Sequence, residues 1–355
     1  MIPQSLKASW KTLLFLVFGF LIFFLYLLIF NVDIQKIIAI AQTIDLKTYF
    51  LAVIAVLLEI FFFSISWRQL LRFLSVKLSL VRAFLYMCFA IFLDILIPAE
   101  SISGDISKIY LVTREHKGTS GKVVASLVTQ RLTGLGINVG SLILGLGLIL
   151  IDRQISGMVL HLTLILVILS TSFLLLLLLL CFKERWMIGI VEFIVKLLNL
   201  VGRGRWNLKK IKADMIRAAK IFHSSMKQYM QAPTALLTSI TLHVFSWFFS
   251  LTVAYLVFMS IGYSVPFGVV IVICAIVAAV RAIPLGVPFE AGLPEITMST
   301  LYILLGVPPD VSATVTLLYS FLTVWLRFFL GFAIQQWLGI KAITDMKREN
   351  LLINL

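Results

Sequence analysis

The chain has 355 residues, of which 61% are hydrophobic and 13% are charged, and its mean hydropathy is +1.07. Because about a quarter of the residues in a typical soluble domain carry charge, this composition excludes a water-soluble globular protein. The formal net charge is +14. In a membrane protein such an excess is typical of basic cytoplasmic loops, so it indicates membrane topology and not a nucleic-acid partner.

Apolar runs bounded by charged residues make up most of the chain. They lie at about 12–30, 48–66, 80–97, 123–151, 158–182, 234–261, 266–283 and 311–338. Each is close to or above the roughly 20 residues that one helical crossing needs. We therefore expect an all-α polytopic membrane protein with about eight transmembrane helices, forming a single integral membrane domain over residues 1–355.

The distribution of Lys and Arg predicts the orientation. Basic residues cluster at 7–11, 68–82, 114–122, 183–227 and 341–348. The alternate connections hold only Lys36, Lys47 and Arg153. By the positive-inside rule, the basic clusters and both termini lie in the cytoplasm. We expect a multi-pass protein of the plasma membrane.

This orientation requires the chain to enter the membrane and turn back twice. The clusters at 68–82 and 114–122 both belong inside, although 98–113 is too short for a further full crossing. The helices that begin at 266 and 311 must likewise both begin outside. Two broken hydrophobic segments in corresponding positions and opposite orientations predict an inverted repeat with a polar site near the middle of the membrane. The residues expected to break the helices are Pro98, Gly104, Pro284, Gly286 and Gly292.

The predicted repeat divides the chain into two halves joined by a basic linker. The first half covers about 12–182 with a re-entrant segment at 98–113, and the second covers about 234–340 with a re-entrant segment at 284–306. Residues 183–231 form the linker. Its apolar residues recur at helical spacing among lysines and arginines: Leu208, Ile211, Met215, Phe222 and Met226. This pattern predicts an amphipathic helix on the anionic cytoplasmic leaflet.

Ionisable residues at membrane depth are costly and are therefore candidates for function. The guanidinium groups of Arg131 and Arg281 suit a phosphate bidentately, and Lys108 adds a third cation. If helices begin after Gly104 and Pro294, their free amide ends also favour an anion, and a solute carboxylate would satisfy the same physics as a phosphate.

Four acids accompany these cations in or beside the broken segments: Asp105, Glu290, Glu295 and Glu100. They are expected to orient the cations, to contact an amine headgroup or to carry a coupling proton. Internal ion pairing, of Asp105 with Lys108 or of Arg281 with Glu295, is the alternative interpretation.

No catalytic or cofactor motif accompanies these residues. The three cysteines, Cys88, Cys181 and Cys274, lie far apart, and the four histidines lack metal-ligand spacing. The sequence contains no P-loop, GxSxG or HExxH. We therefore expect no cofactor, no metal and no enzymatic activity.

The chain resembles the flippase-like transmembrane family, which is named after the membrane region of lysylphosphatidylglycerol synthase. The resemblance covers about residues 10–340 and rests on Trp67-Arg68, Ile97-Pro98, Gly104-Asp105, Gln130-Arg131-Leu132, Arg281-Ala282-Ile283-Pro284, Gly292-Leu293-Pro294-Glu295 and Leu305-Gly306-Val307. It implies a stand-alone lipid-translocating membrane domain, without the aminoacyl-transferase part, whose re-entrant segments surround a headgroup. The chain departs from the family at Ser320, where an arginine is frequent, and Arg327 lies about two turns further on.

We therefore expect a flippase that moves a phospholipid or lipid-linked headgroup between leaflets through a polar cavity. Its expected partners are a membrane lipid and the anionic cytoplasmic leaflet, and the sequence allows a homo-oligomer. An ion-coupled transporter of a small soluble anion is the first alternative. A membrane-embedded lipid-modifying enzyme that uses Glu290 and Glu295 as a carboxylate dyad is the second.

Overall fold

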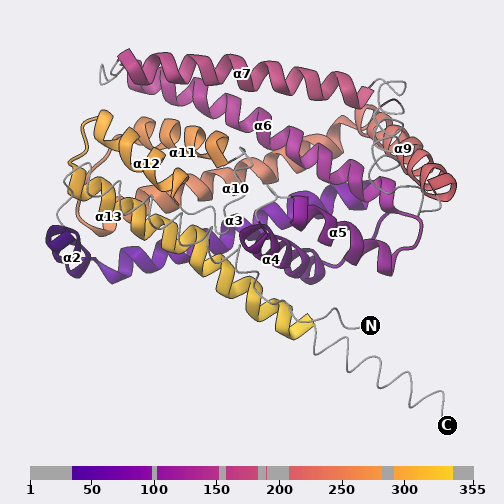
Figure 1. Cartoon of the computed structure of the whole chain (residues 1–355), viewed down its shortest axis with the longest axis horizontal. Coiled ribbons are helices and arrows are strands. Elements are labelled where there is room, and N and C mark those ends of the chain that lie inside the picture. Colours follow the sequence, from indigo (N-terminus) through magenta and orange to yellow (C-terminus); the bar gives the residue numbers. More distant parts are fainter. Residues whose placement is uncertain are drawn as a thin grey trace, which may run out of the picture.

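All regular elements are helices in the part of the chain that the structure describes, as predicted. This computed structural model describes residues 34–97, 102–151, 157–182, 189, 208–281 and 292–338. In chain order the elements are α2 (Ile34–Gln42), α3 (Leu46–Phe73), α4 (Leu80–Leu96), α5 (Ile102–Glu115), α6 (Ser120–Ile151), α7 (Gly157–Phe182), α9 (Leu208–Gln231), α10 (Pro233–Ser260), α11 (Phe267–Arg281), α12 (Leu293–Leu304), α13 (Pro309–Ser320) and the π-helical segment η2 (Phe321–Leu326). They form an elongated bundle (Figure 1).

Four helices of the described residues are long and apolar enough to cross a membrane. They are α3, α6, α10 and the continuous helix Pro309–Leu338, which contains α13 and η2. They coincide with the predicted runs at 48–66, 123–151, 234–261 and 311–338. The run at 158–182 forms α7, and the run at 12–30 lies outside the described residues. The predicted total of about eight crossings stays a prediction.

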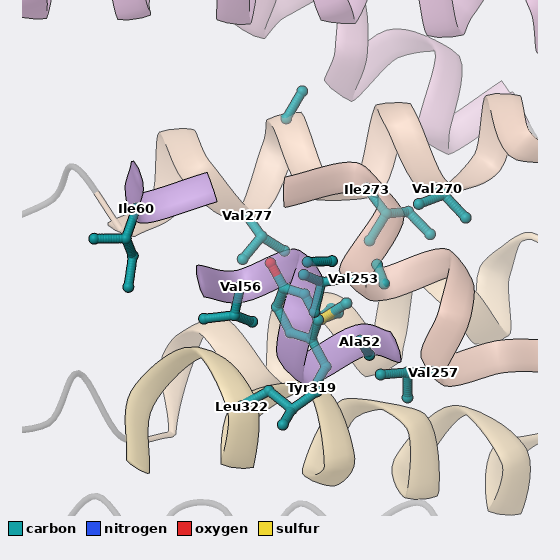
Figure 2. Close-up of a cluster of buried hydrophobic side chains, with 14 of the residues drawn as sticks. Ala52, Val56, Ile60, Val253, Val257, Val270, Ile273, Val277, Tyr319 and Leu322 are labelled. Atoms are coloured by element: carbon teal, nitrogen blue, oxygen red, sulfur yellow. The ribbon is translucent and has the colours of Figure 1, made fainter. Parts of the chain in front are cut away.

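Helices α3 and α10 lie side by side in the middle of the bundle (Figure 1). Small hydroxyl residues join them: Ser66 Oγ donates to the carbonyl of Ser239 at 3.0 Å, and Ser246 Oγ donates to the carbonyl of Glu59 at 3.0 Å. Small side chains at such a contact let two backbones approach closely in a membrane. The apolar core around this pair takes side chains from α3, α10, α11 and α13 (Figure 2).

Helix α3 begins at a well-defined cap. The carboxylate of Asp45 accepts hydrogen bonds from the backbone N–H groups of Lys47 and Thr48, and from the Thr48 hydroxyl at 2.6 Å. The hydrogen bond from Thr48 lowers the pKa of Asp45, which lies outside the apolar span. The backbone N–H of Asp45 donates to the carbonyl of Ser260 at 2.7 Å, so the start of α3 is tied to the end of α10.

Two pairs of short helices lie where the sequence predicts the breaks. The first pair is α4 and α5, and the second is α11 and α12; the members of each pair pack against each other. At 1.5 Å per residue their lengths are about 25, 21, 22 and 18 Å, each less than the roughly 30 Å of the hydrocarbon core. Each of these helices, as described, is therefore shorter than one full crossing, and the re-entrant segments stay a prediction.

The last long helix changes its geometry near its middle. Helix α13 passes into η2, and the helix then continues to Leu338. A π-helical turn inserts one residue into a helix and rotates everything that follows relative to what precedes it. Gly331, after this turn, lies against α4, where an added Cβ would be 2.7 Å from the carbonyl oxygen of Cys88. The turn thus presents different faces of one helix to α12 and to α4.

The basic helix α9 lies at one end of the bundle (Figure 1). Phe222, Met226 and Tyr229 are buried in a cluster with residues of α3 and α6, and the Tyr229 hydroxyl donates to the carbonyl of Leu70 at 2.9 Å. This part of the predicted apolar face is therefore used inside the protein. Contact of α9 with an anionic leaflet would involve its exposed basic side chains, such as Lys220 and Arg217.

Glycines of α6 provide a matched pair of positions for testing the packing of α11. A Cβ on Gly145 would lie 2.6 Å from Val272 Cγ2 and 3.1 Å from the Val272 backbone nitrogen, whereas a Cβ on Gly147 meets nothing within 4 Å. We expect Gly145→Ala to lower the free energy of unfolding by about 1–3 kcal/mol through overpacking. Gly147→Ala should raise it by about 0.5–1 kcal/mol, because alanine favours helix. Thermal unfolding of both variants in detergent checks this, and equal effects would contradict the close packing of α6 on α11.

Candidate functional site

Three charged side chains meet where α5 lies against α6. Asp105 and Lys108 stand one turn apart on α5, and Lys108 Nζ lies 2.9 Å from Asp105 Oδ1. Arg131 reaches the same carboxylate from α6, with its Nη2 at 2.7 Å and its Nε at 2.9 Å from Asp105 Oδ2. The pairing of Asp105 with Lys108, which the sequence offered as the alternative interpretation, is present. One carboxylate thus holds two cations, and the three groups carry a net charge of +1.

The three side chains differ in their exposure. The Lys108 side chain is 7% exposed and the Asp105 side chain 20%, whereas Arg131 keeps 43% of its side chain accessible. Arg131 is therefore fixed by Asp105 while much of its guanidinium group stays open. A guanidinium fork in this state can hold Asp105 and still offer donors to a further oxyanion.

Trp67 of α3 forms the floor under Lys108. The Lys108 ammonium lies 5.6 Å from the centroid of the Trp67 ring, within the range of a cation–π interaction. The indole is fully buried, and its Nε1 donates to Ser126 Oγ of α6 at 3.0 Å. This hydrogen bond fixes the indole, and the indole in turn helps to position the ammonium. In the sequence, only the family motif Trp67-Arg68 singles out Trp67, and no local pattern indicates its contact with Lys108.

The start of α5 is held by Asp94 of α4. Asp94 Oδ1 accepts hydrogen bonds from the backbone N–H of Gly104 at 2.6 Å and from the Ser103 hydroxyl at 2.8 Å. A Cβ on Gly104 would lie 2.7 Å from the carbonyl oxygen of Ala90, so only glycine fits here. Gly104 was predicted to break the helix, which is wrong: it is the third residue of α5, and its lack of a side chain lets α5 approach α4.

A protein carboxylate also occupies the start of α12. Glu295 Oε2 accepts from the backbone N–H of Gly292 at 2.8 Å, and Glu295 Oε1 accepts from the Ser320 hydroxyl at 2.8 Å. Gly292 has φ 106°, a conformation that favours glycine, in keeping with its predicted role as a break. At each of the two helix starts that were expected to favour an anion, a protein carboxylate thus takes one backbone N–H donor, Asp94 at Gly104 and Glu295 at Gly292.

Asp94 offers a direct test of how the site is positioned. We expect Asp94→Ala to cost about 1–2 kcal/mol of unfolding free energy, because the buried Gly104 N–H loses its acceptor and the Ser103 hydroxyl loses its nearest one. Asp94→Asn keeps an acceptor oxygen and should cost less than Asp94→Ala. Ser103→Ala is the control that removes only the hydroxyl donor. Thermal unfolding of the three variants checks the order, and an Asp94→Ala variant as stable as wild type would contradict the capping role.

A second charged cluster involves Glu59, near the middle of α3. Arg327 Nη2 contacts Glu59 Oε2, and both side chains are 16% exposed. The Tyr319 hydroxyl lies within electrostatic range of Arg281, Glu59 and Arg327. Arg281 is also within electrostatic range of the Cys274 thiol, which lies two turns earlier on α11. The structure thus gathers charges from α3, α11 and the long C-terminal helix.

The contacts therefore place the predicted site residues in two clusters. Asp105, Lys108 and Arg131 form the first, whereas Arg281 belongs with the second and Glu295 caps α12. The remaining predicted residues lie outside the described residues: Pro98, Glu100, Pro284, Gly286 and Glu290. Asp94, Glu59 and Arg327 also take part in these contacts, and they are not among the predicted site residues.

The described residues contain no group of three or more His, Cys, Asp or Glu side chains that could hold a metal ion. Cys88 and Cys274 are both free thiols. The chemistry that the two clusters can supply is the binding and release of an anion by guanidinium and ammonium groups.

The all-helical fold, the apolar spans and these intramembrane charges define a multi-pass membrane protein. The chain belongs to the family described as the lysylphosphatidylglycerol synthase TM region, which it matches over residues 13–331. It is also similar to the UPF0104 membrane protein PH1989 of Pyrococcus horikoshii. The two are 19% identical over 314 residues, which cover 86% of this chain and 91% of the relative.

Proposed function

We propose that this protein is a flippase that moves a phospholipid, or a lipid-linked headgroup, from one leaflet of the membrane to the other. The observation that carries the proposal is the half-exposed Arg131, which Asp105 holds beside the buried Lys108. Two cations around one carboxylate leave a net positive charge that the phosphate of a lipid headgroup would neutralise. Membership of the family agrees with a role at the membrane lipid.

The proposed path depends on a membrane topology that is part of the same proposal. The chain crosses about eight times, both termini lie in the cytoplasm, and the protein resides in the plasma membrane. The pairs α4–α5 and α11–α12 are the re-entrant segments of the inverted repeat, since each helix is shorter than the hydrocarbon core. Between them lies the polar path for the headgroup. The hydrocarbon chains stay in the lipid throughout.

Each predicted residue has a place in this mechanism. Arg131 and Lys108 bind the phosphate first, Asp105 orients them, and Arg281 is a later phosphate contact. Glu295 acts indirectly by fixing α12. Glu100 and Glu290 are proposed to contact an amine group or to carry a coupling proton. The exposed bases of α9 hold the anionic leaflet close to the first cluster.

Two alternatives predict other products. An ion-coupled transporter of a soluble anion would use the same cations but would give saturable uptake of a water-soluble substrate. A lipid-modifying enzyme would leave a covalently altered lipid.

The test is reconstitution of the purified chain into liposomes with fluorescent phospholipids of several headgroups. Exchange of labelled lipid between leaflets, faster than in protein-free liposomes, is the expected result. Accumulation of radioactive phosphate in the lumen without lipid exchange would favour the soluble-anion transporter, and a new lipid species by mass spectrometry would favour the enzyme. Folded protein that gives no exchange of any of these lipids would contradict the proposal.

A further inference from the structure

The ion pair between Glu59 and Arg327 lies in the middle of the membrane-spanning part. Glu59 is the fourteenth of the 28 residues of α3, so it stands midway between the two ends of that helix. Trp67, the floor of the first cluster, comes eight residues later, which is about 12 Å further along the helix axis. The two charged clusters are therefore stepped along one helix, one near its Phe73 end and one at its centre.

Arg327 uses only part of its hydrogen-bonding capacity in this pair. Its Nη2 contacts Glu59 Oε2, whereas its buried Nε finds no acceptor among the described residues. Arg131 differs, because both its Nε and its Nη2 contact Asp105. A guanidinium group carries five N–H donors in a fixed fork, and a buried donor without an acceptor is costly. Glu59 therefore satisfies only part of the hydrogen-bonding capacity of the Arg327 guanidinium group.

Two buried hydroxyl groups, on α12 and α13, also lack a partner in the described part of the chain. They are those of Tyr302 and Thr316, and both residues are fully buried. Tyr302 interacts electrostatically with Tyr319, which in turn is within range of Arg327. In Figure 2 the Tyr319 hydroxyl points from α13 between Val56 of α3 and Val277 of α11, one turn before Glu59 and Arg281 respectively.

The π-helical segment η2 lies directly before Arg327. Ser320 directly precedes this segment and is held by Glu295. The two ends of the segment are therefore bound to different helices, α12 and α3. Because a π-helical turn holds one extra residue, its position along a helix determines how the residues that follow it are rotated. Rotation after Ser320 would move Arg327 relative to Glu59.

We propose that Arg327 and Tyr319 form a second oxyanion-binding station at the centre of the membrane, in which Glu59 holds the place of a phosphate group until one arrives. This inference rests on the proposed function for its lipid substrate. The ligand class is a phosphate monoester or diester, supplied by a lipid headgroup or by free phosphate. The carboxylate of Glu59 and the phosphate compete for the same guanidinium group, so the station binds an anion and releases it again.

Binding to this station can be measured without transport. The full-length protein carrying Arg131→Ala, which weakens the first cluster, is purified in detergent. Its thermal unfolding is followed against dihexanoyl phosphatidic acid, inorganic phosphate and, as the phosphate-free control, dihexanoylglycerol. In that background Glu59→Gln is expected to lower the half-saturating concentration of the phosphate lipid about tenfold, because a charged competitor is gone. Adding Arg327→Gln should abolish the stabilisation.

Since Glu59→Gln leaves Arg327 buried without its carboxylate, the double substitution Glu59→Gln with Arg327→Gln is the variant that removes both charges. If Glu59→Gln alone does not fold, the double variant decides. Loss of its stabilisation by the phosphate lipid supports the station. Stabilisation by the phosphate lipid equal to that of the Arg131→Ala protein overturns the station. Stabilisation by phosphatidic acid only identifies a lipid headgroup as the ligand, and stabilisation by inorganic phosphate identifies free phosphate.

These outcomes separate the station from the proposed function. Wild-type protein that exchanges lipid, together with phosphate-lipid binding that ignores Arg327→Gln, overturns the station and leaves the flippase. Protein that exchanges no lipid but shows the expected binding pattern overturns the flippase and leaves the station as an anion site.

Discussion

Replacing Arg131 with alanine is expected to slow leaflet exchange of a labelled anionic phospholipid roughly 10- to 100-fold, because charge-assisted hydrogen bonds to a phosphate contribute about 1.5–3 kcal/mol. Arg131 is the cation of the first cluster that keeps a large exposed area, with 43% of its side chain accessible. Its loss removes the fork that receives the headgroup, while Lys108 and Asp105 keep their mutual contact. The measurement is the exchange rate in liposomes at matched protein content.

Two further variants show whether this loss reflects headgroup binding. Arg131→Lys keeps the positive charge but loses the planar fork, so it should restore only part of the rate. Arg82→Ala breaks an arginine–carboxylate pair of the same kind, with Glu115, where the arginine side chain is 54% exposed. It should leave exchange unchanged. Equal rates for Arg131→Ala and wild type would remove Arg131 from the mechanism.

Replacing Asp105 with alanine is expected to cost about 3–5 kcal/mol of unfolding free energy, because a buried cation loses its carboxylate. Lys108 is the group at risk, since its side chain is only 7% exposed and Asp105 Oδ1 lies 2.9 Å from its ammonium. The same variant should also lose leaflet exchange, since Arg131 loses the carboxylate that orients it. Thermal unfolding in detergent and exchange in liposomes measure the two effects.

A second substitution separates stability from transport. Asp105→Ala combined with Lys108→Met removes the unpaired charge and keeps an unbranched apolar side chain against Trp67. We expect this double variant to recover most of the lost stability but none of the exchange. If Asp105→Ala unfolds at the wild-type temperature, Lys108 does not depend on the carboxylate and the account of the cluster is wrong.

Local sequence patterns were enough to predict the helical fold and part of the first cluster. Apolar runs of spanning length predict α3, α6, α10 and the long C-terminal helix, because one helical crossing needs about 20 apolar residues. The spacing of three between Asp105 and Lys108 places them on one face of α5, where they pair. Helices α4 and α11 end at Leu96 and Arg281, shortly before the predicted breaks at Pro98 and Pro284, which lie outside the described residues.

The contacts that join distant helices could not be predicted in the same way. Glu59 and Arg327 are 268 residues apart, and their pairing depends on how α3 packs against a helix whose register is changed by η2. Apolar periodicity contains no signal for a π-helical turn. Asp94 and Gly104 are only ten residues apart, but their contact requires α5 to fold back onto α4. The sequence indicates the turn but not the register in which the two helices meet.

Photo-crosslinking in liposomes tests directly whether a lipid phosphate binds beside Arg131. A phospholipid with a photoreactive group next to its phosphate is activated in vesicles that contain the protein, and the adducts are mapped by mass spectrometry. We predict adducts concentrated in residues 102–115 of α5 and 126–135 of α6, and a large decrease of these adducts in Arg131→Ala. Adducts spread over the apolar surface of α7, without enrichment around Arg131, would contradict the account.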